Sequence, residues 1–185
     1  MIKVIDNALP NDALHGAIVA AETSKSYGIL HGAGASRDQF KYNWMFYSST
    51  ENIPFENEEM LELWSEVKKH VPSNTRLHRA YVNAHTYGVE DTIHQDDMEL
   101  ERGFTVIVYL CNFWYAQWGG MTAMYEGGDP TAMSVAAAII PKNNRILIFD
   151  KTIPHMVTPL SRLFTGVRLT CMFKLELVEE NGTQT

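Results

Sequence analysis

Two histidines and one aspartate stand at a spacing that restricts how this chain can fold. His94 and Asp96 are separated by a single residue, and His155 follows 61 positions after His94. In an extended segment, side chains two residues apart point to the same side, so His94 and Asp96 can face one point while Gln95 faces away. His155 can join them only if the chain leaves and returns, which a barrel of antiparallel strands achieves.

These three side chains are good ligands for a divalent metal ion. Two imidazoles and one carboxylate on one face of an octahedron leave three positions open, which suits non-haem Fe(II) that binds a co-substrate and O₂ together. A His-x-Asp triplet alone is common by chance, so the surrounding motifs decide its meaning. The other histidines have no partner at ligand spacing, and we expect them to be surface or structural residues: His15, His31, His70, His78 and His85.

The composition is that of one folded domain, which we expect to span residues 1–185. Hydrophobic residues make up 45% of the chain and charged residues 20%, which argues against disorder. No apolar run reaches the roughly 18 residues of a membrane span. The net charge of −7, with no dense run of Lys or Arg, argues against nucleic acid as a partner.

The two cysteines and the N-terminus bear on the compartment. Cys111 and Cys171 lie in apolar, strand-like stretches, and we favour two buried free thiols over a disulfide. Residues 1–6 lack the charged and long apolar regions of a signal peptide. We therefore expect a cytoplasmic protein.

Helical patterns come first along the chain. Apolar residues recur on one face of residues 11–23, and a second helical pattern runs to residue 69 after Asn57, a suitable N-cap. Residues 25–56 are less regular and rich in Gly and Ser. We therefore expect residues 1–75 to supply a helical supporting layer.

Strand patterns fill the rest of the chain. Short β-branched and aromatic runs alternate with turns that contain Gly, Pro and Asn. The expected strands are residues 79–87, 104–110, 121–125, 134–140, 145–149, 155–159 and 167–177. The pattern predicts a mostly β fold with N-terminal helices, in which residues 76–178 form a jelly-roll barrel or sandwich.

Several motifs agree in order and spacing with a known family. The run Val106–Leu110 follows the His-x-Asp triplet, Gly119-Gly120 precedes a strand, and His155 follows the apolar strand 145–149. Residues 81–173 resemble the iron(II)- and 2-oxoglutarate-dependent oxygenases, and among them the prolyl 4-hydroxylase-like branch. The resemblance implies a double-stranded β-helix, which is a cupin-like jelly-roll barrel.

The resemblance also implies a role for each motif residue. His94, Asp96 and His155 would hold Fe(II), and Arg168 would bind the distal carboxylate of 2-oxoglutarate, for which a planar guanidinium is well suited. Further residues implied around that carboxylate are Thr170, Tyr109 and, from the opposing strand, Tyr87 or Asn83. Arg162 is the competing carboxylate binder, but it lies in a loop-like segment. Collagen-type prolyl hydroxylases place Lys at the position of Arg168, so the collagen type is not implied.

The implied activity is hydroxylation of a C–H bond with Fe(II), 2-oxoglutarate and O₂, and ascorbate is a further candidate cofactor. A prolyl residue in a peptide is the favoured substrate. A free amino acid, another small molecule or a nucleobase stays open, as do a cupin-like metalloprotein that does not use 2-oxoglutarate and a non-catalytic binding module. Aromatic side chains that would line a substrate groove or fill the core are Tyr42, Trp44, Phe46, Trp114, Tyr115, Trp118 and Tyr125. We expect no membrane partner, and the oligomeric state stays open.

Overall fold

The structure, a computed structural model, describes most of the chain. Side chains and backbone are described for residues 1–24, 57–89, 91–96, 99–129 and 131–179, and residues 27–31 and 42–50 are described by their backbone alone.

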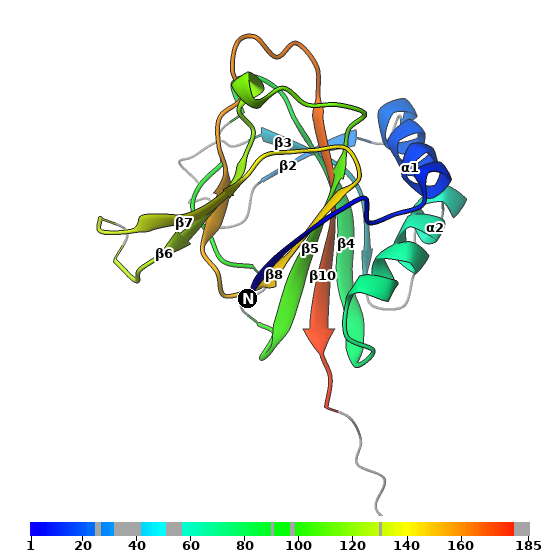
Figure 1. Cartoon of the computed structure of the whole chain (residues 1–185), viewed down its shortest axis with the longest axis horizontal. Coiled ribbons are helices and arrows are strands. Elements are labelled where there is room, and N and C mark those ends of the chain that lie inside the picture. The colour runs from blue at the N-terminus through cyan, green and yellow to red at the C-terminus, as the bar shows by residue number, and fades with distance from the viewer. Residues whose placement is uncertain are drawn as a thin grey trace, which may run out of the picture.

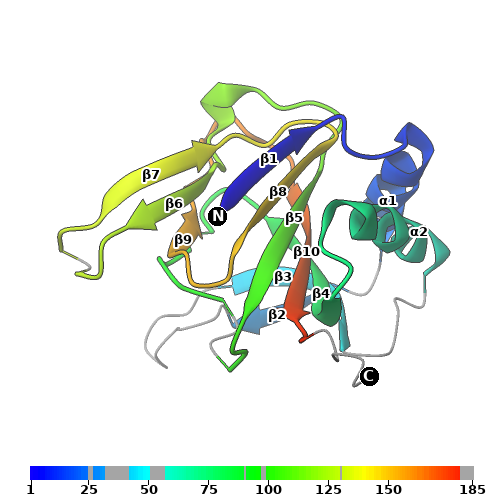
Figure 2. The ribbon, with the colours of Figure 1, turned by 60° about the horizontal axis from the view of Figure 1, so that its bottom comes forward.

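Two antiparallel sheets form the body of the molecule (Figures 1 and 2). The major sheet has seven strands in the order β1 (Ile2–Asp6), β8 (Arg145–Asp150), β5 (Gly103–Leu110), β10 (Arg168–Leu177), β4 (Thr75–His85), β3 (Tyr42–Thr50) and β2 (Tyr27–His31). The minor sheet has three strands in the order β7 (Ser134–Ile139), β6 (Thr122–Glu126) and β9 (His155–Val157). This pair of sheets is the double-stranded β-helix that the sequence predicts.

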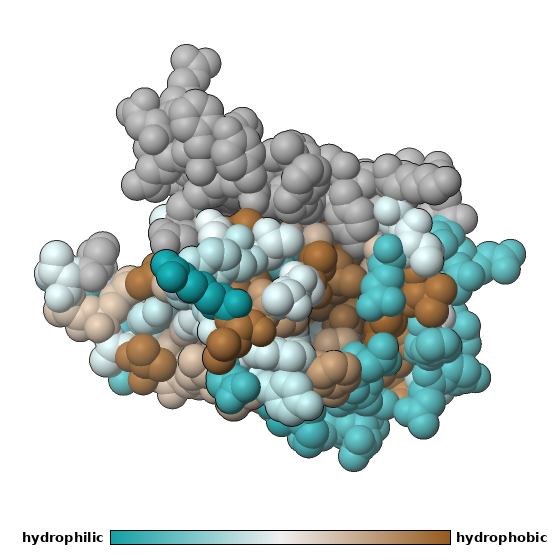
Figure 3. All heavy atoms as spheres, turned by 90° about the horizontal axis from the view of Figure 1, so that it is seen from above, coloured by the Kyte–Doolittle hydropathy of each residue, from teal (hydrophilic) through white to brown (hydrophobic). Residues whose placement is uncertain are grey.

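Two helices cover the outer face of the major sheet, on the side away from the minor sheet (Figures 1 and 2). They are α1 (Asn11–Thr23) and α2 (Glu58–Val67), and α2 continues into a 3₁₀ turn, η1 (Lys68–His70). The side chain of Asn57 accepts a hydrogen bond of 3.1 Å from the backbone N–H of Met60, which caps α2 as predicted. Seen from above, hydrophilic residues gather on the side of the molecule that carries the helices (Figure 3).

The alternation of side chains along β10 separates two cores. Leu169, Cys171, Phe173 and Leu175 face the helices and belong to the larger core, in which the rings of Phe173 and Trp64 stack with centroids 5.0 Å apart. The intervening residues lie on the inner face, between the two sheets, and all are buried: Arg168, Thr170, Met172 and Lys174. Three of these four side chains are polar, and buried polar side chains on one face of a strand mark the inner face of β10 as the candidate functional surface.

The predicted helices and the later strands are confirmed, and their ends either coincide with the prediction or shift by up to four residues. Three strands were missed: β1, β2 and β3, so residues 1–75 contribute strands to the major sheet as well as helices. Strand β1 lies at an edge with mainly exposed residues, so it has no alternating apolar pattern to detect. Strands β2 and β3 lie within the stretch whose Gly and Ser content disguises them.

Both cysteines are free thiols, but only Cys171 is buried as expected, since Cys111 is partly exposed. Cys171 is buried in the helix-facing core, whereas Cys111 lies just after β5 against the inner core, and neither forms a disulfide. Among the described helices, none has the length and apolar character that a membrane span requires.

Candidate active site

The three predicted metal ligands meet at one point between the sheets. His94 and His155 form an isolated antiparallel bridge in which each backbone N–H donates to the other's carbonyl, at 3.0 and 2.9 Å. Two residues after His94, the backbone N–H of Asp96 donates to the carbonyl of Lys151 at 3.0 Å, which holds the segment 94–96 in place. One ligand atom from each of the three side chains lies within 4.8 Å of the others. Backbone pairing thus brings together residues far apart in the sequence.

Both imidazoles are oriented for metal binding through Nε2. The Nδ1 atom of His94 lies 2.8 Å from the carbonyl oxygen of Thr92, and Nδ1 of His155 lies 2.9 Å from that of Ile153. A carbonyl only accepts, so each Nδ1 carries a proton, which leaves Nε2 as the nitrogen that can bind a metal ion. A backbone acceptor of this kind fixes the ring and its tautomer at metal sites.

The surroundings favour the charge states that a metal needs. Burial is the main influence on His155 and lowers its pKa to about 4, against the attraction of Asp96, so the ring is neutral at pH 7. For Asp96, burial alone would raise the pKa. The positive charge of Lys174, together with hydrogen bonds from Lys174 and Thr105, outweighs burial and holds the pKa of this carboxyl below its usual range. Two imidazoles and one carboxylate are a suitable donor set for Fe(II).

Sequence reasoning missed Thr105 and Lys174, which contact Asp96. The hydroxyl of Thr105 donates to Oδ2 of Asp96 at 2.6 Å, and the ammonium group of Lys174 forms an ion pair with the same oxygen. Both residues lie on the inner face, at neighbouring positions of β5 and β10. The available signal was the even spacing of Lys174 from Arg168 on one strand, which places both on the same face.

Arg168 lies on the same inner face, buried with 1% of its surface exposed. Its Nε donates to the carbonyl of Gly120 at 2.8 Å, and Nη2 donates to the hydroxyl of Thr122 at 3.3 Å. Its third nitrogen, Nη1, is buried and has no hydrogen-bond partner. No carboxylate in the described part of the chain forms an ion pair with this guanidinium. An unpaired, buried N–H donor on a cation fits the carboxylate of a small dicarboxylic acid.

Tyr109 and Thr170 lie on the same inner face as Arg168. The guanidinium carbon of Arg168 lies 5.6 Å from the centre of the Tyr109 ring. The hydroxyl of Tyr109 is 2.8 Å from that of Thr122. Because the Thr122 hydroxyl also accepts a hydrogen bond from Arg168, Thr122 connects Tyr109 to the guanidinium. Thr170 lies opposite Tyr109 on β5 and opposite Asn83 on β4, so all three point to the inner face. Thr122, which was not predicted, completes this group.

The structure does not place Tyr87 in this group. Tyr87 lies beyond the end of β4 in a turn, is half exposed, and accepts a hydrogen bond of 3.0 Å from Nε of Arg162 at the surface. The strand was expected to run through Tyr87, and it ends at His85 instead. Arg162 is exposed in a turn after β9, which agrees with the lower rank that the sequence assigns to it.

His85 takes the place that was predicted for Tyr87, and the expectation that it is a surface or satisfied structural histidine is wrong. It is 3% exposed and lies directly opposite Arg168 in the register of β4 and β10. Its Nδ1 is buried without a partner. Burial, with a smaller contribution from Arg168, lowers the pKa of His85 to about 3, so the ring is neutral and one nitrogen is a donor. His85 can therefore serve the same carboxylate as Arg168.

The Gly119-Gly120 motif lets the backbone approach Arg168. Gly120 has a φ of +65°, and a Cβ placed there would lie 2.7 Å from a Leu160 methyl and 3.1 Å from the Arg168 side chain. Gly119 has a φ of +69° and would meet the carbonyl of Pro159 at 2.5 Å. Glycine is favoured at both positions, because it adopts a positive φ without strain and has no Cβ to meet these neighbours.

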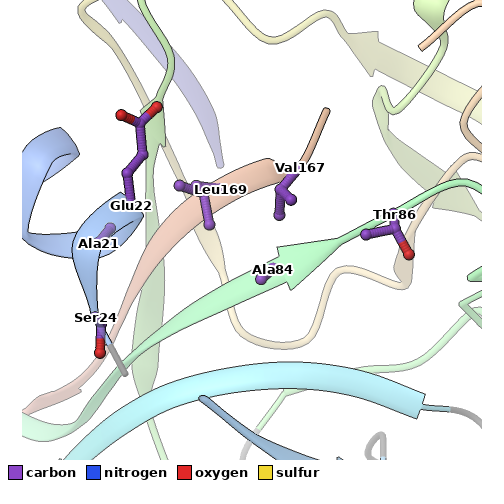
Figure 4. Close-up of a pocket in the computed structure, with 7 residues that line it drawn as sticks. All are labelled: Ala21, Glu22, Ser24, Ala84, Thr86, Val167 and Leu169. Carbon is purple, nitrogen blue, oxygen red and sulfur yellow. The ribbon is translucent and has the colours of Figure 1, made fainter. Parts of the chain in front are cut away.

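Two pockets lie near these groups. A pocket of about 220 Å³ borders His94 and is also lined by Ile93, Gln95, Gly127, Gly128, Met133 and Pro154. This pocket lies beside His94, next to the turn between β6 and β7. A larger pocket, about 510 Å³, lies on the helix side of the major sheet and is lined by Ala21, Glu22, Ser24, Ala84, Thr86, Val167 and Leu169 (Figure 4). Its lining includes no triad residue, so we do not assign the active site to it.

Three of the aromatic residues considered for a substrate groove or for the core, Trp114, Tyr115 and Trp118, cluster at the end of the sheet that carries Arg168, away from the metal ligands. Rings from the loop after β5 and from Phe164 pack in a cluster with centroids 4.8 to 5.6 Å apart: Phe113, Trp114, Tyr115, Trp118 and Phe164. Trp114 packs next to Gly120, behind Arg168. Asp96, by contrast, contacts the opposite ends of β5 and β10. The side chains of Tyr42, Trp44 and Phe46 lie outside the described residues.

Comparison with known proteins agrees with this geometry. Residues 77–173, just over half of the chain, match the model of the 2OG-Fe(II) oxygenase superfamily. Comparison with curated protein sequences finds no match.

Solved structures show the same fold at low sequence identity. A Trichoplax adhaerens prolyl hydroxylase in complex with a peptide of hypoxia-inducible factor is 18% identical, with a TM-score of 0.70 over 95% of this chain and 83% of that one. A Pseudomonas putida prolyl-4-hydroxylase is 14% identical, with a TM-score of 0.65 over 95% and 92%. The carbocyclase SnoK of nogalamycin biosynthesis is 12% identical, with a TM-score of 0.68 over 94% and 78%. With the family match on residues that include the triad and Arg168, the chain belongs to the 2OG-Fe(II) oxygenase superfamily.

Proposed function

We propose that this oxygenase hydroxylates a prolyl residue in a peptide or protein. The assignment to the 2-oxoglutarate-dependent oxygenases rests on one observation: three metal ligands converge near a buried guanidinium whose Nη1 has no hydrogen-bond partner. The choice of a peptide substrate is supported by similarity in fold to two prolyl hydroxylases, one of them bound to a peptide. The pocket beside His94 opens at the metal site, where a substrate side chain could enter.

We infer that one group of residues binds the metal ion and another binds the co-substrate. We assign Fe(II) to His94, Asp96 and His155, each oriented by the backbone or a neighbouring side chain. Arg168 would bind the distal carboxylate of 2-oxoglutarate through its unpaired Nη1. Bound Fe(II) and 2-oxoglutarate supply O₂ activation, in which one oxygen atom enters a C–H bond and 2-oxoglutarate becomes succinate and CO₂.

Three neighbours of Arg168 would complete the grip on the co-substrate. Burial raises the pKa of Tyr109, so its phenol stays neutral and can donate a hydrogen bond. Thr122 holds both Tyr109 and Arg168 in place, and the neutral ring of His85 adds a further polar atom on the same face.

The inner core keeps water from the reacting groups. Apolar side chains from both sheets form a buried cluster on the inner face, beside the metal ligands and Arg168: Ile107, Met124, Leu147, Phe149 and Met172. The ring of Phe149 contacts that of His155 with centroids 4.7 Å apart. Exclusion of water strengthens the ionic and hydrogen-bond contacts that orient a bound acid.

Succinate formation with Fe(II) and 2-oxoglutarate, measured across a substrate panel, tests the proposal. We expect a Pro-containing peptide to stimulate succinate release and to gain the mass of one oxygen atom. The panel also contains the matched peptide with Ala in place of Pro, free proline, and single-stranded and duplex DNA. Turnover of a nucleic acid, or of free proline with no peptide activity, would contradict the prolyl-peptide substrate and leave the oxygenase class intact.

A further inference from the structure

A buried lysine contacts the carboxylate of the proposed metal site. Lys174 is 1% exposed, and its ammonium group forms an ion pair with Oδ2 of Asp96. The same ammonium donates to the hydroxyl of Thr105 at 3.3 Å, and that hydroxyl donates to Oδ2 at 2.6 Å. Lys174 lies opposite Thr105 in the register of β10 and β5, so the sheet itself holds the two donors side by side.

The two oxygens of Asp96 therefore have different surroundings. Oδ2 contacts Lys174 and Thr105 and lies 3.4 Å from Nε2 of His155. Oδ1 lies 3.7 Å from Nε2 of His94. A metal ion held by the two imidazoles and Asp96 would share this carboxylate with a cation that the protein supplies.

The two cations oppose each other. A divalent ion and an ammonium group that contact one buried carboxylate repel at short range, with little water to screen them. Without metal, Lys174 instead balances the charge of Asp96, which would be costly to leave buried and unpaired. The lysine thus stabilises the metal-free protein and destabilises the metal-bound protein, and both effects lower the affinity for metal.

We propose that Lys174 is a positioning residue whose ammonium group aims Asp96 before metal binds and then competes with the metal for this carboxylate. The inference rests on the proposed Fe(II) site. It implies a centre that releases metal more readily than the same three ligands would alone. The fraction of loaded enzyme would therefore follow the concentration of Fe(II).

Metal affinity of the full-length, metal-free protein tests the proposal without reference to turnover. The probe is Mn(II), titrated by calorimetry into the parent and into Lys174→Met, which keeps the length of the side chain and removes its charge. We expect Lys174→Met to bind Mn(II) about tenfold more tightly, or better, a change of the size that residues next to metal ligands produce. Lys142→Met, which removes the same charge from a surface pair with Asp6, should leave the affinity unchanged.

A second variant separates charge from orientation. Thr105→Val removes a hydrogen bond to Asp96 and leaves all formal charges in place, so we expect it to weaken Mn(II) binding by about tenfold. Opposite signs for Lys174→Met and Thr105→Val would support competition by the ammonium charge. If Lys174 served only to pack the sheet, its substitution would not strengthen Mn(II) binding while Thr105→Val weakens it.

Circular dichroism and thermal unfolding establish whether each variant is folded. Weaker or unchanged Mn(II) binding in folded Lys174→Met overturns the proposal. If Lys174→Met does not fold, Lys174→Gln keeps a donor and removes the charge, and unchanged or weaker binding there overturns it equally. If the parent protein binds no Mn(II), the proposed metal site itself is refuted. If the parent binds Mn(II) and the lysine variants bind it equally well, only the proposal on Lys174 is refuted.

Discussion

At the scale of single residues, the triad makes the most direct prediction. His94→Ala, Asp96→Ala and His155→Ala should each abolish stoichiometric binding of Fe(II) or Mn(II), because two remaining ligands leave the ion poorly held. Calorimetric titration measures the binding, and circular dichroism checks that the sheets persist. His70→Ala is the matched control, since that histidine lies on the helix side and contacts the carbonyl of Ala8. Parent-like metal binding in all three variants would show that the triad is misassigned.

Arg168 makes a second prediction at this scale. Arg168→Ala should raise the KM for 2-oxoglutarate by more than tenfold and spare Mn(II) binding, because losing a buried ionic partner commonly costs ~3–5 kcal/mol and 1.4 kcal/mol corresponds to a factor of ten. Arg162→Ala removes an exposed guanidinium that contacts Tyr87, so it should change the KM little. Steady-state succinate formation at varied 2-oxoglutarate provides the measurement. A large effect in Arg162→Ala with none in Arg168→Ala would reverse the assignment.

At the scale of elements, α2 depends on its N-cap. Asn57→Ala removes the side-chain hydrogen bond to the backbone N–H of Met60 and should lower the free energy of unfolding by about 1 kcal/mol. Asn57→Asp keeps an acceptor at the helix N-terminus and should retain most of the stability. Urea denaturation measures both variants. Since α2 packs on the outer face of the sheet, Mn(II) affinity should not change, and a marked change would mean that the two faces are coupled.

At the scale of the whole molecule, a buried neutral histidine makes folding depend on pH. His85 has its pKa lowered from 6.5 to about 3 in the folded protein, so the unfolded chain binds one more proton between these values. Stability from this group is complete above pH 6.5 and is lost as the pH falls, by up to about 1.4 kcal/mol per pH unit.

Urea denaturation between pH 7 and pH 4 tests this dependence. His85→Gln cannot take up the proton, so its stability should fall less steeply over this range than that of the parent. The slopes are compared rather than the absolute stabilities, because the substitution itself can destabilise the fold. Equal slopes in the two proteins would show that His85 does not titrate as its burial implies.

The sequence by itself was sufficient for the metal triad and for most of the fold. The His-x-Asp spacing and the alternating strands after residue 76 are local patterns, and the local geometry of strands converts them into structure. His155 and Arg168 were assigned through the resemblance of the surrounding motifs to an oxygenase family, and the apolar neighbours of Arg168 favoured an inward position. Strand β1 could not be found, because its exposed side chains leave no apolar alternation.

Only the tertiary structure decided which side chains surround those residues. His85 replaced Tyr87 because β4 ends two residues earlier than its pattern suggests, and its register with β10 sets His85 opposite Arg168. Thr105, Thr122 and Lys174 likewise acquire their roles through neighbouring strands and sheets, over separations of up to 174 − 96 = 78 residues. Register between distant strands is set by the packing of the whole barrel, so no local pattern in the sequence specifies these contacts.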